Sequence, residues 1–215
     1  MPTSTFFRLP EEKRQRLIDA AWEEFTSTSF ADASINRIIR KARIPRGSFY
    51  QYFEDKDDLF WHLLGQIRGY FFRVFEEVLR ETNGELFPFP VCFFDRFLNR
   101  WGDADPILLR CIQIVQLNPG FDFKSLLFQD GWLMTEPLLE LADLTGFRRK
   151  DPAFVNHVCV LLLAPLAYAV METFKTPEQW EQQREILLER IQIIKWGSLL
   201  PEGTGGSAEQ GGAQC

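Results

Sequence analysis

Basic side chains are concentrated in one short stretch of the chain, residues 34 to 53. This stretch holds five basic side chains and no acidic one. Guanidinium and ammonium groups bind phosphate oxygens, and Arg and Gln side chains can pair with guanine and adenine edges. The stretch therefore predicts a surface that contacts nucleic acid, although a solvated basic face on two packing helices is the alternative that composition leaves open. The five basic residues are Arg37, Arg40, Lys41, Arg43 and Arg46.

The charge of the whole chain hides this basic stretch. The 215 residues carry 24 Lys and Arg against 30 Asp and Glu, a formal net charge of −6. Residues 1–56 contain 10 basic and 8 acidic residues, whereas residues 57–215 contain 14 and 22. The acidic balance therefore belongs to the later part of the chain, and a net negative charge does not argue against nucleic-acid binding by the earlier part.

Helical periodicity positions the basic stretch, and no run of alternating β-branched residues predicts a strand. Pro10 followed by two glutamates is a helix start, Ser34 and Asp55 are predicted N-caps, and Asn83-Gly84 is a helix end. The sequence predicts an all-α protein of about nine helices. The expected helices span residues 10–26, 35–42, 46–53, 56–82, 88–101, 105–117, 123–144, 152–174 and 177–196.

Two short helices joined by a three-residue break at 43–45 have the layout of a helix-turn-helix, whose second helix enters the major groove. The segment IPRGSFYQYFEDKDDLF, residues 44 to 60, resembles the signature of the tetracycline-repressor (TetR) family of bacterial transcription regulators. The resemblance covers about residues 10–60. The matching positions are Gly47, Ser48, Phe49, Tyr50, Gln51, Tyr52, Phe53, Lys56 and Leu59.

The residue types suggest how this segment could hold DNA. Gly47 lets the backbone come close to the duplex, and Tyr50, Tyr52 and Lys56 could bind phosphate oxygens. The backbone N–H of Ser34, at a helix N-terminus, could do the same.

Base readout is assigned to Gln51 and Arg46, with Arg37 as a further candidate. Phe49 and Phe53 are expected to lock the helix against the core. The predicted DNA-binding residues are Ser34, Arg37, Arg46, Gly47, Ser48, Tyr50, Gln51, Tyr52 and Lys56.

The resemblance also implies a second domain and a mechanism. It implies a DNA-binding domain over 1–56 and a helical effector-binding and dimerisation domain over 57–200, and we expect a disordered Gly-rich tail over 201–215. Operator DNA and a second copy of the chain are the implied partners. A repressor would release its operator when a small, largely apolar effector binds; an effector-independent helical DNA-binding regulator is the alternative.

Two further sets of residues follow from this implied domain. Apolar positions on the last two helices are predicted to form the homodimer interface: Val155, Val158, Leu162, Leu166, Leu187, Ile191 and Ile194. The excess of phenylalanine, 21 residues in all, suggests either packed core or an aromatic effector pocket. The pocket candidates are Phe71, Phe75, Phe93, Phe97, Trp101, Arg110, Gln113, Trp132 and His157.

Other functional classes have little support in the sequence. Two histidines and four scattered cysteines give no metal-ligand spacing, and no nucleophile–base pair or Gly-rich phosphate loop is present. We therefore expect no enzyme, no cofactor and no metal. Residues 152–171 lack charge over a length that could span a membrane, but Asn156, His157 and Pro165 favour a buried helix of a cytoplasmic protein.

Overall fold

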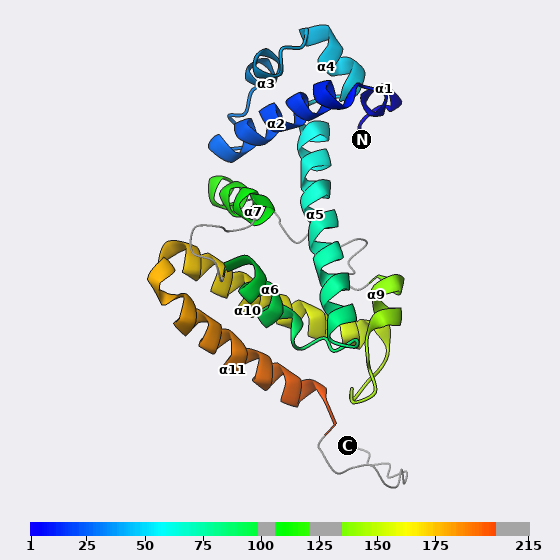
Figure 1. The fold of residues 1–215 in the computed structure, drawn as a ribbon, viewed down its shortest axis with the longest axis vertical. Helices are drawn as coiled ribbons and strands as arrows, with labels where there is room; N and C mark the ends of the chain where they lie inside the picture. The colour runs from blue at the N-terminus through cyan, green and yellow to red at the C-terminus, as the bar shows by residue number, and fades with distance from the viewer. Residues whose placement is uncertain (99–105, 121–134, 201–215) are drawn as a thin grey trace, which may run out of the picture. The chain divides into compact units, whose positions relative to one another are not determined.

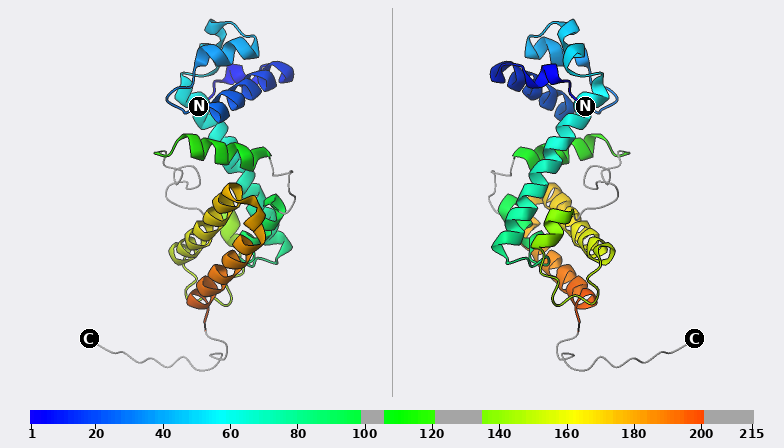
Figure 2. Two further views of the ribbon diagram at one scale, coloured as in Figure 1. Left: turned by 90° about the vertical axis from the view of Figure 1, so that its left-hand side faces the viewer. Right: turned by 90° about the vertical axis from the view of Figure 1, so that its right-hand side faces the viewer.

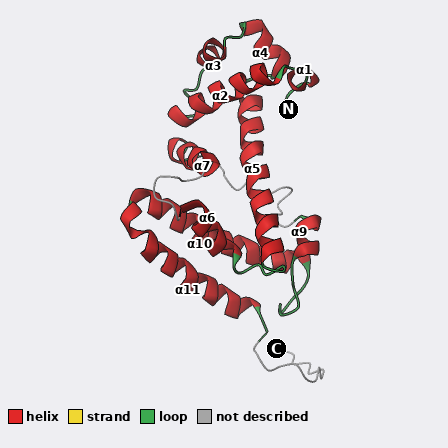
Figure 3. Cartoon of the chain, in the orientation of Figure 1, coloured by secondary structure: helices red, strands yellow, loops and turns green. Residues whose placement is uncertain are grey.

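The computed structural model describes residues 1–98, 106–120 and 135–200, without the side chains of residues 97 and 98 (Figure 1). The described residues form ten α-helices and one 3-10 helix (Figure 3), which confirms the all-α prediction. The α-helices are α1 (Ser4–Phe7), α2 (Glu11–Ser27), α3 (Ile35–Ala42), α4 (Arg46–Tyr52), α5 (Lys56–Glu81), α6 (Phe89–Leu98), α7 (Pro106–Leu117), α9 (Glu136–Leu141), α10 (Pro152–Lys175) and α11 (Trp180–Ser198).

Local sequence signals set most helix ends. Asp55 accepts a 2.7 Å hydrogen bond from the backbone N–H of Asp58, so it caps α5 as predicted. Asn83 and Gly84 have φ angles of 52° and 87°, and this left-handed backbone ends the helix. The short helix α1 was not predicted from the sequence. The predicted helix over 123–144 is described only from residue 135, and the expected tail lies outside the described residues.

The chain divides into two compact units, of which the first comprises 1–75 and 97–131. In both views of Figure 2, α2, α3 and α4 gather around the first turns of α5. Their core holds fully buried Phe25, Phe49 and Phe53, which confirms that the two latter side chains are core residues. Helix α7 also belongs to this unit: it packs on α2, and its Ile114 lies in the same core.

The second unit comprises 76–96 and 132–215. Here α10 packs along α11. Helix α10 is long and apolar enough to cross a membrane by length and composition, but it is half-buried in the protein as a core helix.

Most of the residues predicted for the dimer interface lie inside this second unit. Six of them are between 0 and 5% exposed, namely Val155, Val158, Leu162, Leu166, Leu187 and Ile191, and Ile194 is half-buried. The large apolar side chains that are exposed on the same two helices are instead Leu161, Tyr168, Ile193 and Trp196.

Candidate nucleic-acid interface

Helices α3 and α4 are joined by a tight turn. Arg43 adopts the left-handed conformation, with φ 54° and ψ 48°. The N–H of Arg43 and that of Ile44 donate to the carbonyls of Arg40 and Ile39 at 3.3 and 3.0 Å, which closes the end of α3. Pro45 then sits just before α4 with φ −62°. The predicted helix-turn-helix is therefore formed.

Helix α4 has one buried and one exposed face. Phe49 is fully buried, and Tyr52 is only 3% exposed. The structure therefore places Tyr52 with the core residues rather than on the outer face, where a phosphate contact would need it. The outer face carries the predicted residues Arg46, Gly47, Tyr50 and Gln51, all exposed, with Ser48 half-buried.

The five basic side chains of this region fall into two groups. Arg37 and Lys41 form ion pairs with Glu24 and Glu23 of α2. The other three are exposed and form no ion pair with any residue that the structure describes. Charge that is already paired contributes less to a phosphate contact, so the freely available positive charge comes from Arg40, Arg43 and Arg46.

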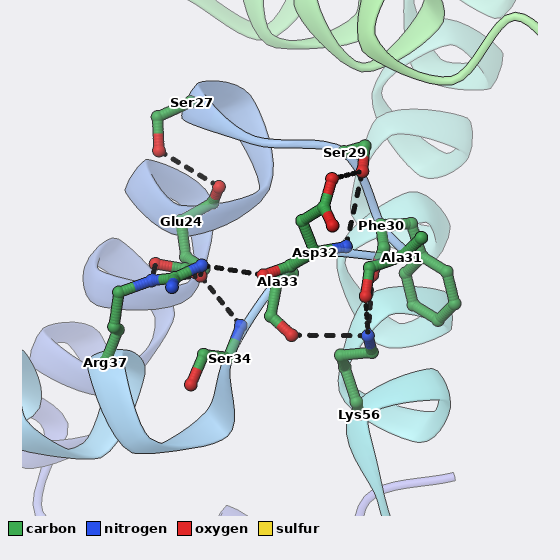
Figure 4. A network of polar contacts seen from close by, with 10 residues as sticks. All are labelled: Glu24, Ser27, Ser29, Phe30, Ala31, Asp32, Ala33, Ser34, Arg37 and Lys56. Carbon is green, nitrogen blue, oxygen red and sulfur yellow. Dashed lines mark hydrogen bonds and ion pairs between the residues drawn. The ribbon is translucent and has the colours of Figure 1, made fainter.

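Glu24 is the anchor for the start of α3 (Figure 4). Glu24 is 8% exposed, and its carboxylate accepts hydrogen bonds from the backbone N–H of Ser34 at 2.7 Å and from Nε of Arg37 at 2.8 Å. Burial by itself would raise the pKa of Glu24, but the hydrogen bonds from Arg37 and Ser34, together with the nearby positive charge, hold that pKa below its ordinary value. The Ser34 N–H that was assigned to a phosphate is thus committed to Glu24.

Lys56 lies on the other side of the same loop (Figure 4). Its Nζ donates to the carbonyls of Phe30, Ala31 and Ala33 at 2.6, 3.2 and 3.2 Å, and it lies 4.6 Å from the centre of the Phe30 ring. An ammonium group has three N–H donors, and three carbonyl oxygens accept hydrogen bonds from it here. The geometry makes Lys56 a support for the loop before α3.

Two polar residues that support this interface, Glu24 and Asn118, were not predicted from the sequence. Glu24 is an acidic residue on a helix that otherwise looks amphipathic, and Asn118 lies outside the segment that carries the motif. Asn118 accepts a 2.7 Å hydrogen bond from the backbone N–H of Phe30 and donates to the carbonyl of Ile114 at 2.8 Å. No local pattern marks either residue, because both act through contacts distant in sequence.

The residues predicted for an effector pocket do not share one environment. Phe75 and Phe93 are buried and Phe71 is half-buried against the core of the first unit. Gln113 and His157 are exposed. Arg110 lies over the indole ring of Trp22 at 4.9 Å. The side chain of Phe97, together with Trp101 and Trp132, lies outside the described residues.

Comparison with known proteins agrees with this local geometry. Residues 17–63 match the model of "Bacterial regulatory proteins, tetR family". The chain is 36% identical over 71 residues to the uncharacterized HTH-type transcriptional regulator YdgC of Bacillus subtilis, and 34% identical over 74 residues to the transcriptional regulator AcuR of Cereibacter sphaeroides. These matches cover 33 and 34% of this chain and 36 and 33% of those relatives, about a third of their length.

A TetR family transcriptional regulator from Chloroflexus aurantiacus is 26% identical, and the match covers 93% of this chain and 99% of that one with a TM-score of 0.44.

Proposed function

We propose that this chain, as a DNA-binding transcriptional regulator of the tetR family, is a homodimeric repressor of bacterial genes. A small effector would control its binding to DNA. Because the matched family consists of regulators, the proposal also holds that the chain is not an enzyme. The proposal divides the chain functionally near residue 56, with the DNA-reading part before it and the effector and dimer part over 57–200. A cytoplasmic location, where DNA is accessible, follows from the same proposal.

The outer face of α4 is the observation that carries the DNA-binding proposal. It presents Arg46 and Gln51 for base edges, with Tyr50 available for a phosphate oxygen. Gly47 lies beside them with open space where a Cβ would be, which permits close approach of the backbone. The unpaired charges of Arg40 and Arg43 add phosphate attraction around this face.

The test is binding to a duplex that the full-length chain has selected from a random-sequence library, followed by fluorescence anisotropy. Arg46→Ala and Gln51→Ala should each weaken binding and relax the preference at one base position, because a lost base contact costs about 1–3 kcal/mol of discrimination. Arg16→Ala is the control, since Arg16 lies on α2 and pairs with Glu12. Unchanged affinity and sequence preference in both α4 variants would refute the assignment.

A homodimer is proposed because an apolar surface remains exposed on α10 and α11. Ile193 and Trp196 are 59 and 73% exposed, and Leu161 and Tyr168 are 55 and 50% exposed. A second copy of the chain placed on this surface would cover them in a two-fold arrangement and would supply a second recognition helix for a second half-site. The buried positions predicted earlier would then support the interface from inside rather than line it.

The effector part of the proposal rests on the aromatic residues. The 21 phenylalanines of the chain supply the kind of side chain that an apolar or aromatic ligand would contact. Thermal-shift screening of the full chain with apolar compounds tests this, followed by release of the selected duplex. A screen without any shift or release would favour the alternative, an effector-independent regulator.

A further inference from the structure

Thr3, the residue just before the short helix α1, binds the C-terminal end of α4. The last carbonyls of a helix have no partner within it and need one from outside. The backbone N–H of Thr3 donates to the carbonyl of Tyr52 at 2.9 Å, and its hydroxyl Oγ1 donates to the carbonyl of Gln51 at 2.6 Å. Both bonds join residues that are about 48 positions apart in the sequence.

The segment is fixed in place by a buried aromatic side chain. Phe6 of α1 is 1% exposed, and its ring lies 4.9 Å from that of Phe53 and 5.3 Å from that of His62, measured between ring centres. Leu9 is also packed against the same core. Burial of an aromatic ring contributes a large favourable free energy to folding. The buried Phe6 ring therefore keeps Thr3 beside α4.

A seven-residue helix needs such external support. Isolated helices of this length are not stable in water, and helix ends fray first. Phe49 and Tyr52 anchor one face of α4 to the core, but Gln51 is exposed and its side chain depends on the position of its own backbone. Thr3 binds that backbone directly through the Gln51 carbonyl.

From these contacts we propose that the N-terminal segment, residues 3–9, is a clamp on the recognition helix and that Thr3 is a positioning residue for base readout by Gln51. The inference rests on the proposed function, in which α4 reads DNA. Thr3 does not contact DNA in this mechanism. It restricts the conformational freedom of the end of α4 before DNA binds, so less conformational entropy is lost on binding.

The experiment compares three variants of the full-length chain. Thr3→Val keeps the shape and removes the hydroxyl donor, Thr3→Ser restores the donor, and Thr5→Val makes the same change at an exposed position on α1. Amide hydrogen exchange of Phe49–Phe53 reports on the end of α4. Anisotropy with the library-selected duplex, and with duplexes changed at single base positions, reports on readout.

Thr3→Val should raise exchange at the end of α4 about fivefold, as expected for loss of one hydrogen bond. It should also weaken duplex binding by a similar factor, with the discrimination lost mainly at the base that Gln51→Ala also affects. Thr3→Ser should restore both quantities, and Thr5→Val should change neither.

Two results would overturn the clamp. One is exchange in Thr3→Val equal to that in Thr5→Val; the other is faster exchange without any change in affinity or base preference. The exchange measurement needs no DNA, so a wild-type chain that selects no duplex would refute the proposed function while the clamp on α4 was still tested.

Discussion

The side-chain oxygen of Asn118 accepts a 2.7 Å hydrogen bond from the backbone N–H of Phe30, 88 residues earlier in the chain. The carbonyl of the same Phe30 accepts a hydrogen bond from Lys56 at 2.6 Å. Residue 30 is therefore held on its N–H side from the end of α7 and on its carbonyl side from the start of α5. This residue lies in the loop that leads into α3, so the start of the helix-turn-helix depends on two later parts of the chain.

Asn118→Ala should loosen this loop, because a part-buried N–H loses its acceptor. The expected loss in the free energy of unfolding is about 1–2 kcal/mol. Amide exchange at residues 30–34 should rise more than exchange in α2, as measured by mass spectrometry. Gln116→Ala is the matched control, since Gln116 is exposed in the last turn of α7, two residues before Asn118. Equal exchange in the two variants would contradict the proposed support.

The sequence predicted the parts of this fold that local signals determine. The N-cap at Asp55, the helix end at Asn83-Gly84 and the break at 43–45 all follow from residue types at fixed spacing. The outer face of α4 was predicted in the same way, because Phe49 and Phe53 had to point to the core. Such features need only residues within a few positions of each other.

The features that the sequence did not predict depend on contacts between distant residues. Lys56 has the position of a phosphate ligand in the motif, but the carbonyls that accept its hydrogen bonds come from the loop before α3. In the sequence, Tyr52 and Tyr50 are equally good candidates for a phosphate contact, but in the structure Tyr52 is buried in the core and Tyr50 is exposed. Likewise, an apolar stripe on α10 does not reveal whether α11 or a second copy of the chain covers it.

Glu24→Gln should destabilise the protein near neutral pH, because the neutral amide loses the charge-assisted hydrogen bonds to Arg37 and Ser34. The expected loss is about 2 kcal/mol at pH 7, measured as a shift in denaturant midpoint.

The pH dependence of the Glu24 contribution has a definite sign. Since folding lowers the pKa of this carboxyl, its stabilisation is fully present above the ordinary carboxyl pKa and is lost as the pH falls through the folded value. The difference between wild type and Glu24→Gln should therefore be largest from pH 5 to 7 and shrink below about pH 4. A difference that stayed constant down to pH 3 would show that the ion pair is not its source.

Lys56→Met should lower the melting temperature while leaving the salt dependence of DNA binding almost unchanged. The methionine keeps an apolar side chain but leaves the carbonyls of Phe30, Ala31 and Ala33 without their donor. Arg40→Met is the comparison, because Arg40 is exposed on α3, forms no ion pair with the described residues and is proposed to attract phosphate. Loss of one phosphate contact reduces the slope of log affinity against log salt by about 0.9. If Lys56→Met reduced this slope as much as Arg40→Met, the ammonium would be a phosphate ligand after all.

Trp196→Glu should dissociate the proposed homodimer without unfolding the protomer. The indole is 73% exposed in the single chain, so little packing is lost within it, whereas a carboxylate buried in an apolar interface is strongly unfavourable. Sedimentation velocity should show the variant as a monomer at concentrations where the wild type is a dimer. Gln113→Glu adds the same charge at an exposed site on α7 and should remain dimeric. A wild type that sedimented as a monomer at every concentration would refute the dimer itself.

Arg43→Gly should change stability and DNA affinity in opposite directions. Arg43 has a φ of 54°, and the left-handed conformation costs a side-chain-bearing residue about 1–2 kcal/mol. Glycine removes that cost but gives the unfolded chain more freedom, so the net stabilisation should be about 0.5–1 kcal/mol. Removing the exposed, unpaired charge should at the same time weaken DNA binding and lower its salt dependence.

Arg43→Lys, which keeps the charge and the strain, should match the wild type in both thermal denaturation and anisotropy. Arg43→Asn should lose affinity like the glycine variant, because asparagine tolerates the left-handed backbone but carries no charge. Equal DNA affinity and salt dependence in all four proteins would remove Arg43 from the proposed interface, and a less stable glycine variant would show that its backbone is not strained.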